Sequence, residues 1–102
     1  MYEIRPTKAY RKAYKRVSKH KDIDLELLDT VIDKLASGEK LAAKDRDHQL
    51  TGELKKFREC HIHNDLLLVY QKIDDILVLV LVNIGSHSGL FGQSVNRTKS
   101  SH

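Results

Sequence analysis

Three histidines occupy positions where a small domain has no obvious packing use for them. His87 follows closely on the most apolar run of the chain, ILVLVLV at 76–82, and lies between Gly85 and a Leu-Phe pair. His61 stands in the stretch FRECHIHND at 57–65, and His48 stands in a polar stretch before it. Imidazole titrates near pH 6.5, so two such rings can hold one neutral and one protonated member at physiological pH. The histidines are therefore candidates for a paired general base and general acid.

Strand alternation decides which side chains of FRECHIHND face the same space. Glu59 and His61 fall on one face, and Arg58 and Cys60 fall on the other. Asp65 follows at a hairpin, and the third histidine lies just past the end of a later strand. In a small twisted sheet the middle of one strand can face the end of another. We therefore expect the three histidines, Glu59 and Asp65 to converge on the open face of the sheet, opposite its helices.

Each of these residues also has a purely structural interpretation. A lone loop histidine such as His48 is usually a surface residue. Asp65 could cap a turn through its side-chain oxygen. Arg58 and Glu59 could form an exposed ion pair that contributes little. Phe91 could belong to the core rather than to a contact surface. The residue types alone leave both interpretations open.

A metal site and a thiol nucleophile have weaker support. His61 and His63 form an H-x-H on one strand face, and His48 could add a third ligand. Cys60 points to the opposite face, however, and the chain has no C-x-x-C or H-E-x-x-H spacing. A cysteine in mid-strand is expected to be buried and inert. We therefore predict no metal and no cofactor.

The elements that must position these residues follow from hydrophobic periodicity. YEIR at 2–5 alternates like a short strand. One helix begins near Thr7, and a second helix, capped near Asp22 or Asp24, ends at Gly38. The stretch 39–56 is polar and long for a small domain, with a helical turn expected at 41–44, and such connections are often functional. Three strands are expected to follow, at 57–62, 66–72 and 76–84.

The pattern of apolar residues predicts how these elements pack. Each helix has one apolar stripe, made of Tyr10, Ala13, Tyr14 and Val17 in the first and of Leu28, Val31, Ile32 and Leu35 in the second. The short breaks HND and IDD indicate antiparallel hairpins between the later strands. The predicted fold class is α+β, with an N-terminal short strand and a two-helix hairpin packed on one face of a small antiparallel β-sheet.

Length and composition bound the kind of protein. The chain has 102 residues, enough for one domain, and we assign residues 1–92 to it and residues 93–102 to a mobile polar tail. No run approaches the roughly 20 apolar residues of a membrane span. The polar N-terminus shows no signal peptide. A single cysteine excludes an internal disulfide and suits a reducing cytoplasm. We expect a cytoplasmic protein with no membrane partner.

Positive charge is concentrated at the N-terminus. Residues 1–21 contain eight Lys or Arg and one acid, whereas residues 22–54 contain four bases and nine acids. Lys8, Arg11, Lys12 and Lys15 occupy the polar faces of the first helix. Such a block can attract a polyanion such as RNA, or an acidic protein. It can equally be a solvated helix face.

Two stretches together resemble a known family. DHQLTGELKKFRECHIHNDLLLVY at 47–70, followed by NIGSHSGLFG at 83–92, is similar to the YafQ-type branch of the RelE/ParE superfamily of bacterial type II toxins. The branch pattern is D-H-x-L-x-G, then F-R-x-x-H-I-x-x-D-x-L-L-x-Y, then G-[ST]-H-x-x-L-F. The matching residues are Asp47, His48, Leu50, Gly52, Phe57, Arg58, His61, Ile62, Asp65, Leu67, Leu68, Tyr70, Gly85, Ser86, His87, Leu90 and Phe91. In element order the likeness runs from about residue 2 to residue 92.

The resemblance implies a RelE-like fold and a metal-independent endoribonuclease that cleaves mRNA on the ribosome. The basic first helix would then contact ribosomal RNA. The resemblance also implies a neutralising antitoxin, through which the toxin–antitoxin complex binds operator DNA. The residues that it implies in the active site are His48, His61, Asp65, His87 and Phe91. Among them it makes His87 the general acid, and it makes Phe91 a residue that places the substrate base or the histidine. Glu59 falls where some relatives have a functional acid.

The chain departs from the family pattern at the residue that is expected to contact the scissile phosphate. Relatives commonly have Arg where Asn83 stands, and that Arg is the expected partner of the scissile phosphate. Arg58 or a lysine of the 39–56 stretch would then have to contact the phosphate instead. Two smaller departures are Leu66 in place of an aromatic residue and Asn64 in place of a proline.

Two other functions remain open. Asn83 would suit a catalytically weakened toxin homologue that binds the ribosome or the antitoxin without cutting. A ParE-like protein acting on a DNA-associated target is the third possibility, and the set of histidines argues against it because ParE-like relatives lack that set.

Overall fold

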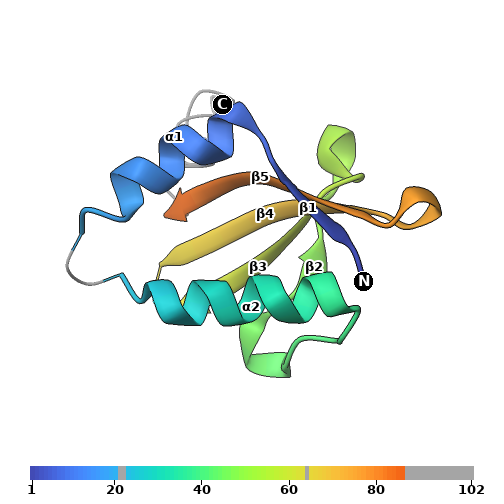
Figure 1. Cartoon of the computed structure of the whole chain (residues 1–102), viewed down its shortest axis with the longest axis horizontal. Helices are drawn as coiled ribbons and strands as arrows, with labels where there is room; N and C mark the ends of the chain where they lie inside the picture. The colour runs from blue at the N-terminus through green and yellow to red at the C-terminus, as the bar shows by residue number, and fades with distance from the viewer. Residues whose placement is uncertain (21–22, 64, 87–102) are drawn as a thin grey trace.

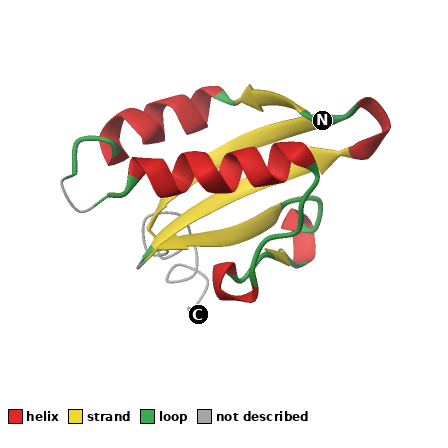
Figure 2. Cartoon of the chain, turned by 60° about the horizontal axis from the view of Figure 1, so that its bottom comes forward, coloured by secondary structure: helices red, strands yellow, loops and turns green. Residues whose placement is uncertain are grey.

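Two helices lie across one face of a five-stranded sheet in the computed structural model, which describes residues 1–20, 23–63 and 65–86 (Figures 1 and 2). The strands are β1 (Glu3–Pro6), β2 (His48–Gln49), β3 (Arg58–His63), β4 (Leu66–Ile73) and β5 (Val78–Ser86). The helices are α1 (Lys8–Val17) and α2 (Leu25–Ser37), with the short 3-10 helices η1 (Ala43–Asp45), η2 (Gly52–Leu54) and η3 (Asp74–Ile76). The predicted α+β class is confirmed. The tail assigned to residues 93–102, and the domain boundary before it, lie outside the described residues.

The sheet is mixed, which corrects the prediction of a wholly antiparallel one. Its order is β1-β5-β4-β3-β2, and β1 runs parallel to β5 whereas the other neighbours are antiparallel. β5 is the most apolar strand and has one hairpin neighbour, β4, so β1 covers its other edge. β1 runs directly into α1, and α1 packs back across the sheet. The end of β1 must therefore lie where α1 begins, which fixes the direction of β1 as parallel to β5. There the Thr7 N–H donates to the Leu81 carbonyl at 2.9 Å.

Side-chain caps fix the ends of both helices. The Thr7 hydroxyl accepts from the Tyr10 N–H at 3.0 Å, which caps α1 as predicted. The same hydroxyl donates to the Val82 carbonyl at 2.8 Å, where the pairing of β4 and β5 shifts register. Asp24, and not Asp22, caps α2 by accepting from the Leu27 N–H at 3.0 Å. At the other end of α2, Gly38 has the predicted left-handed conformation, with φ of 87°.

The core lies between the helices and one face of the sheet. Both predicted apolar stripes point into it, and α1 and α2 run in roughly opposite directions across the strands (Figure 2). From the sheet it contains Cys60, Ile62, Leu66, Leu68, Tyr70, Leu79, Leu81 and Ile84. Cys60 is fully buried, and burial raises the pKa of its thiol well above the usual range, so the thiol is inert as predicted. In the part of the chain that is described, no helix has the length and apolar character to cross a membrane.

The connection from residue 39 to 56 contains more structure than its polar sequence predicts. Its helical turn is η1, close to the turn expected at 41–44. Beyond that turn, β2 pairs with β3, with His48 opposite Glu59 and Gln49 opposite Arg58. The Gln49 side-chain amide donates to the Lys55 carbonyl at 2.6 Å, which closes the hairpin. A strand of two residues is too short for alternation to show, so only the pairing identifies it.

A register shift in β3 removes the predicted H-x-H pair. His61 pairs with Leu67, but His63 pairs with Leu66, so the ladder between β3 and β4 is irregular between the two histidines. Nε2 of His63 accepts from the backbone N–H of Asp24 at 3.1 Å, at the start of α2. The expectation that His61 and His63 share one face as potential ligands is therefore wrong, because a bulge redirects the second side chain.

Candidate active site

Strand register brings three polar residues and one valine into a row across the face of the sheet that is turned away from the helices. His48 on β2 pairs with Glu59 on β3, which pairs with Val69 on β4, which pairs with Asn83 on β5. Directly paired residues of antiparallel strands share a face. The neighbouring residue Cys60 belongs to the core, so this row faces the other way. We call these four residues the open-face row.

His48 is held at both ring nitrogens. Nδ1 lies 2.7 Å from the Arg46 carbonyl oxygen, and Nε2 lies 3.3 Å from Oε1 of Glu59. A carbonyl can only accept, so Nδ1 must bear a proton. Nε2 then faces the Glu59 carboxylate. The Glu59 side chain is 10% exposed, against 50% for His48. The buried carboxylate of Glu59 thus has His48 as its partner, and His48 itself is open to solvent.

His61 differs from His48 because its ring has no bonded partner in the described ranges. It pairs with Leu67, which pairs with Gly85, so it lies one row along the same face. Two residues along a strand separate it from Glu59, which is about 7 Å. Its side chain is half-buried. Within residues 1–20, 23–63 and 65–86, neither ring nitrogen forms a hydrogen bond or an ion pair. Both are available to a ligand.

The remaining predicted catalytic residues belong to the end of the sheet where His61 lies. Asp65 is exposed in the turn between β3 and β4. Ser86 is the last described residue of β5 and pairs with Leu66, so the chain leaves β5 beside that turn. His87 and Phe91 lie outside the described residues, and their approach to His61 and Asp65 stays a prediction. Within the described residues, the structure brings together His48, Glu59 and His61.

Arg58 lies on the opposite face from the open-face row, as alternation predicted. Its Nε donates to Oδ1 of Asp47 at 3.1 Å. The Tyr70 hydroxyl donates to the same oxygen at 2.5 Å. Burial, and then this bond to Asp47, raises the pKa of the Tyr70 phenol well above its usual range. Sequence reasoning assigned no role to Asp47 or Tyr70, although both match the family pattern. Arg58 does not face His48 or His61, and its predicted contact with phosphate has no support in the geometry of the described residues.

Asn83 ends the open-face row without a charge. Its Oδ1 accepts from the Ile84 N–H at 2.9 Å, which holds the half-buried side chain against its own strand. Apart from Arg58, the cations nearest in sequence to His48 and Glu59 lie in the 39–56 stretch. Arg46 and Lys55 are exposed there, and each is tied to the hairpin by its backbone carbonyl. A phosphate contact from this region would therefore come from a surface side chain.

The basic residues of α1 form a separate surface. Tyr10, Ala13 and Val17 face the core, so the remaining positions point outward. Lys8, Arg11, Lys12 and Lys15 are all exposed. Across the described part of the chain, no carboxylate lies within ion-pair distance of these four. Their charge is uncompensated locally, as a surface for polyanions requires.

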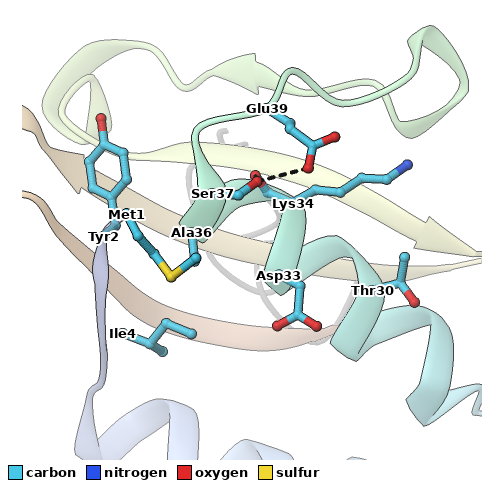
Figure 3. Close-up of a pocket in the computed structure, with 9 residues that line it drawn as sticks. All are labelled: Met1, Tyr2, Ile4, Thr30, Asp33, Lys34, Ala36, Ser37 and Glu39. Atoms are coloured by element: carbon cyan, nitrogen blue, oxygen red, sulfur yellow. Dashed lines mark hydrogen bonds between the residues drawn. The ribbon is translucent and has the colours of Figure 1, made fainter.

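A groove between β1 and α2 is not part of this arrangement. It is lined by residues of both elements, among them Tyr2, Ile4, Asp33 and Lys34 (Figure 3). His48, His61 and Glu59 do not line it. The site candidate is thus the open face of the sheet, not this hollow.

A helical layer on a mixed sheet, with histidines and a buried carboxylate on the open face, fits the RelE-like fold and the site that the resemblance to YafQ-type toxins implies. Comparison with known proteins narrows the class. The model of the family described as "Bacterial toxin of type II toxin-antitoxin system, YafQ" matches residues 2–92. The chain belongs to this family.

Comparison with individual proteins leads to the same family. The mRNA interferase toxin YafQ of Escherichia coli K12 is 34% identical over 85 residues, which cover 81% of this chain and 88% of that protein. A Haemophilus influenzae protein assigned to the YafQ toxins is 42% identical over 45 residues, and there the match spans 42% of this chain and 44% of the relative's length. The E. coli DinJ-YafQ toxin-antitoxin complex has a TM-score of 0.78 at 29% identity, covering 89% of this chain and 98% of that one.

A fourth relative is a metal-bound toxin from Helicobacter pylori. Its crystal structure has a TM-score of 0.81 at 47% identity, covering 89% of this chain and 100% of that one. Among the described residues of the present chain, no three His, Cys, Asp or Glu side chains come together as a metal site would need.

Proposed function

We propose that this toxin is an endoribonuclease that cleaves mRNA on the ribosome, in the cytoplasm, and that its own side chains carry out the chemistry without a metal ion. Membership of the YafQ family supports the toxin role, and the E. coli relative's name, mRNA interferase, supports RNA as the substrate. The observation that carries the proposal is the open face itself. It presents the His48–Glu59 pair beside His61, whose ring is uncommitted within the described residues.

The reaction is an attack of the 2′-OH on its own 3′-phosphate. The new bond joins O2′ to phosphorus, and the bond from phosphorus to the 5′-oxygen of the next nucleotide breaks. A base must take the 2′-OH proton, an acid must protonate the departing 5′-oxygen, and the phosphate needs positive charge around it. The products are a 2′,3′-cyclic phosphate and a 5′-OH. Nothing is oxidised or reduced, and no co-reactant is consumed.

Each predicted residue takes one role in this scheme. His61 is the base, because neither of its ring nitrogens has a bonded partner within the described residues. His87 remains the acid that the family pattern implies. Asp65, exposed at the turn beside β5, orients the imidazole of one of these two histidines. Phe91 stacks against the substrate base or supports His87.

The His48–Glu59 pair contacts the phosphate, although both ring nitrogens of His48 have partners within the protein before substrate binds. Nδ1 is already committed to a carbonyl, so the ring cannot turn without losing that bond. Half of the His48 side chain is exposed, so its Nε2 can exchange the 3.3 Å contact with Glu59 for a phosphate oxygen. Asn83 adds a neutral amide where relatives have a cation. An exposed cation of the 39–56 stretch, such as Lys44 or Arg46, therefore completes the charge around the phosphate.

Two macromolecular partners follow from the same proposal. The uncompensated cations of α1 bind ribosomal RNA, and this contact weakens steeply with salt because each phosphate contact releases counterions. The second partner is an antitoxin whose segment folds on the toxin, by analogy with the E. coli complex. The toxin–antitoxin complex then binds operator DNA through the antitoxin.

The test is mRNA cleavage in a translating extract, mapped by primer extension. His61→Ala and His87→Gln should each lower the cleavage rate by roughly 10² to 10⁴, the usual contribution of one positioned acid or base. Ribosome co-sedimentation should be unchanged. His20→Ala is the matched control, because His20 lies at the end of α1, outside this face. Toxin treated with EDTA and returned to buffer should cut at the untreated rate. If both histidine variants cut at the parental rate, the assigned chemistry is wrong.

A weakened toxin that binds without cutting is the second candidate, and Asn83 is the observation in its favour. That function predicts a parental protein that binds ribosomes or antitoxin but leaves mRNA intact. In that case Asn83→Arg should restore cleavage. A ParE-like action on a DNA-associated target has no observation of its own here, and a gyrase inhibition assay would detect it.

A further inference from the structure

Two buried or half-buried donors converge on one oxygen behind the open face. Arg58 on β3 and Tyr70 on β4 are direct cross-strand partners. Both donate to Oδ1 of Asp47, at 3.1 Å from Arg58 Nε and at 2.5 Å from the Tyr70 hydroxyl. The ladder fixes the positions of both donors, so together they fix the carboxylate. We call these three residues the Asp47 cluster.

The Asp47 cluster is partly buried, because its ion pair is joined to a fully buried tyrosine. Tyr70 is 1% exposed, and the Asp47 and Arg58 side chains are 25% and 39% exposed. A buried phenol hydroxyl without a partner is costly, and Asp47 satisfies it. A carboxylate that accepts from both a guanidinium and a hydroxyl is held in one place. The cluster therefore fixes the backbone at residue 47.

The next residue along the chain is His48. Neighbouring side chains of an extended strand point to opposite faces, so anchoring Asp47 behind the sheet directs His48 to the front. On the other side of Asp47, Arg46 has the left-handed conformation, with φ of 51°, and its carbonyl meets Nδ1 of His48. β2 has only two residues, so its ladder with β3 holds His48 weakly without a further anchor.

We infer that the Asp47 cluster is a positioning device that holds the His48 ring against Glu59, and that Arg58 serves the site through Asp47 and not through the phosphate. The catalytic part of this inference rests on the proposed ribonuclease function. The geometric part does not, because it concerns the ring of His48 in the free protein. Asp47, Arg58 and Tyr70 are thus positioning residues for a side chain on the opposite face.

The test therefore has one arm that needs no activity. In the free protein, the His48 ring nitrogens and carbons are followed by NMR in the parental chain and in Asp47→Ala. We expect the His48 signals to move toward those of an unrestrained histidine, with the His61 signals unchanged. Asp47→Asn keeps an acceptor oxygen for both donors and should keep most of the parental His48 signals. Glu53→Ala, an exposed acid in the same connection, should change neither ring.

The second arm measures cleavage. Asp47→Ala should lower kcat by roughly tenfold to a hundredfold, the scale of a misplaced group, with the KM for programmed ribosomes unchanged. Asp47→Asn should recover most of that loss. In a His48→Ala background the Asp47→Ala change should cost no further activity, because its effect passes through His48. An equal loss in both backgrounds would show that Asp47 acts by another route, and the inference would fail.

The two arms separate this inference from the proposed function. If the parental protein cuts no mRNA, the ribonuclease proposal fails while the NMR arm still decides whether the Asp47 cluster positions His48. If Asp47→Ala leaves the His48 signals unchanged, the positioning inference fails whatever the activity. Should Asp47→Ala not fold, Tyr70→Phe removes a single oxygen from the same cluster. It should shift the His48 signals in the same direction, and its failure to do so overturns the inference.

Discussion

Glu59→Gln tests how much the pairing of Glu59 with His48, in the open-face row, contributes to the stability of the protein. Gln has the same shape and keeps an oxygen that His48 can donate to, so the change removes charge and little else. Oε1 of Glu59 and Nε2 of His48 lie 3.3 Å apart, which for a protonated His48 and an effective dielectric constant of 20 is about 5 kcal/mol of Coulomb attraction. Half of the His48 side chain is exposed to water, which reduces that figure strongly.

The measurable loss is set by the difference between two kinds of hydrogen bond. A bond to a charged group contributes about 1.5–3 kcal/mol and a neutral one about 0.5–1.5 kcal/mol, so Glu59→Gln should lower the free energy of unfolding by about 1–2 kcal/mol. For a domain of this size each kcal/mol corresponds to roughly 4–8 °C in Tm. The buried carboxylate also bears a desolvation cost, which the amide relieves and which opposes the loss.

Urea denaturation at neutral pH is the assay, with Tm as a second measure. Glu53→Gln is the control, because Glu53 is exposed in the hairpin that ends at β3 and should lose nothing measurable. The double variant with His48→Gln completes a cycle, in which Glu59→Gln should cost about 1 kcal/mol less than it does alone. If Glu59→Gln is as stable as the parental protein, or if the cycle shows no coupling, the pair does not hold His48 and the reasoning behind the row is refuted.

Three further predictions concern the cap, the alkaline limit and the phosphate. Thr7→Val removes an acceptor from the start of α1 and a donor from the Val82 carbonyl, so it should cost about 1–2 kcal/mol in urea denaturation, whereas Thr51→Val, which caps nothing with its side chain, should cost little. Burial raises the pKa of Tyr10 from 10.0 to about 12, so the contribution of Tyr10 to stability should be complete below pH 10 and lost between about pH 10 and 12. Tyr10→Phe should flatten that part of the profile of stability against pH. Absorbance at 295 nm follows the ionisation of tyrosine, and denaturation at each pH gives the stability. Asn83→Arg should raise the mRNA cleavage rate if position 83 faces the scissile phosphate, and a rate unchanged or lowered at equal ribosome binding would count against that placement.

Local chemistry in the sequence was enough to predict both long helices and the four longer strands, but not β2 or the 3-10 helices η2 and η3. Threonine and aspartate at the helix starts, and glycine at the end of α2, terminate the backbone as their side chains require, and the structure has Thr7, Asp24 and Gly38 in those positions. The period of two in FRECHIHND placed Glu59 and His61 away from Arg58 and Cys60, because successive strand residues must alternate. The family pattern supplied the rest of the site prediction, of which His87 and Phe91 lie outside the described residues.

The tertiary structure decided what depends on pairing between distant segments. The parallel position of β1 follows from the free edge of β5, about 75 residues further along the chain. A bulge removed His63 from the face that alternation assigns to it. Asp47 meets Arg58 and Tyr70, which are 11 and 23 residues away, only because β2, β3 and β4 lie side by side in one register. Periodicity is a property of neighbouring residues, whereas register is fixed by the packing of the whole sheet, and the direction of His48 depends on that register.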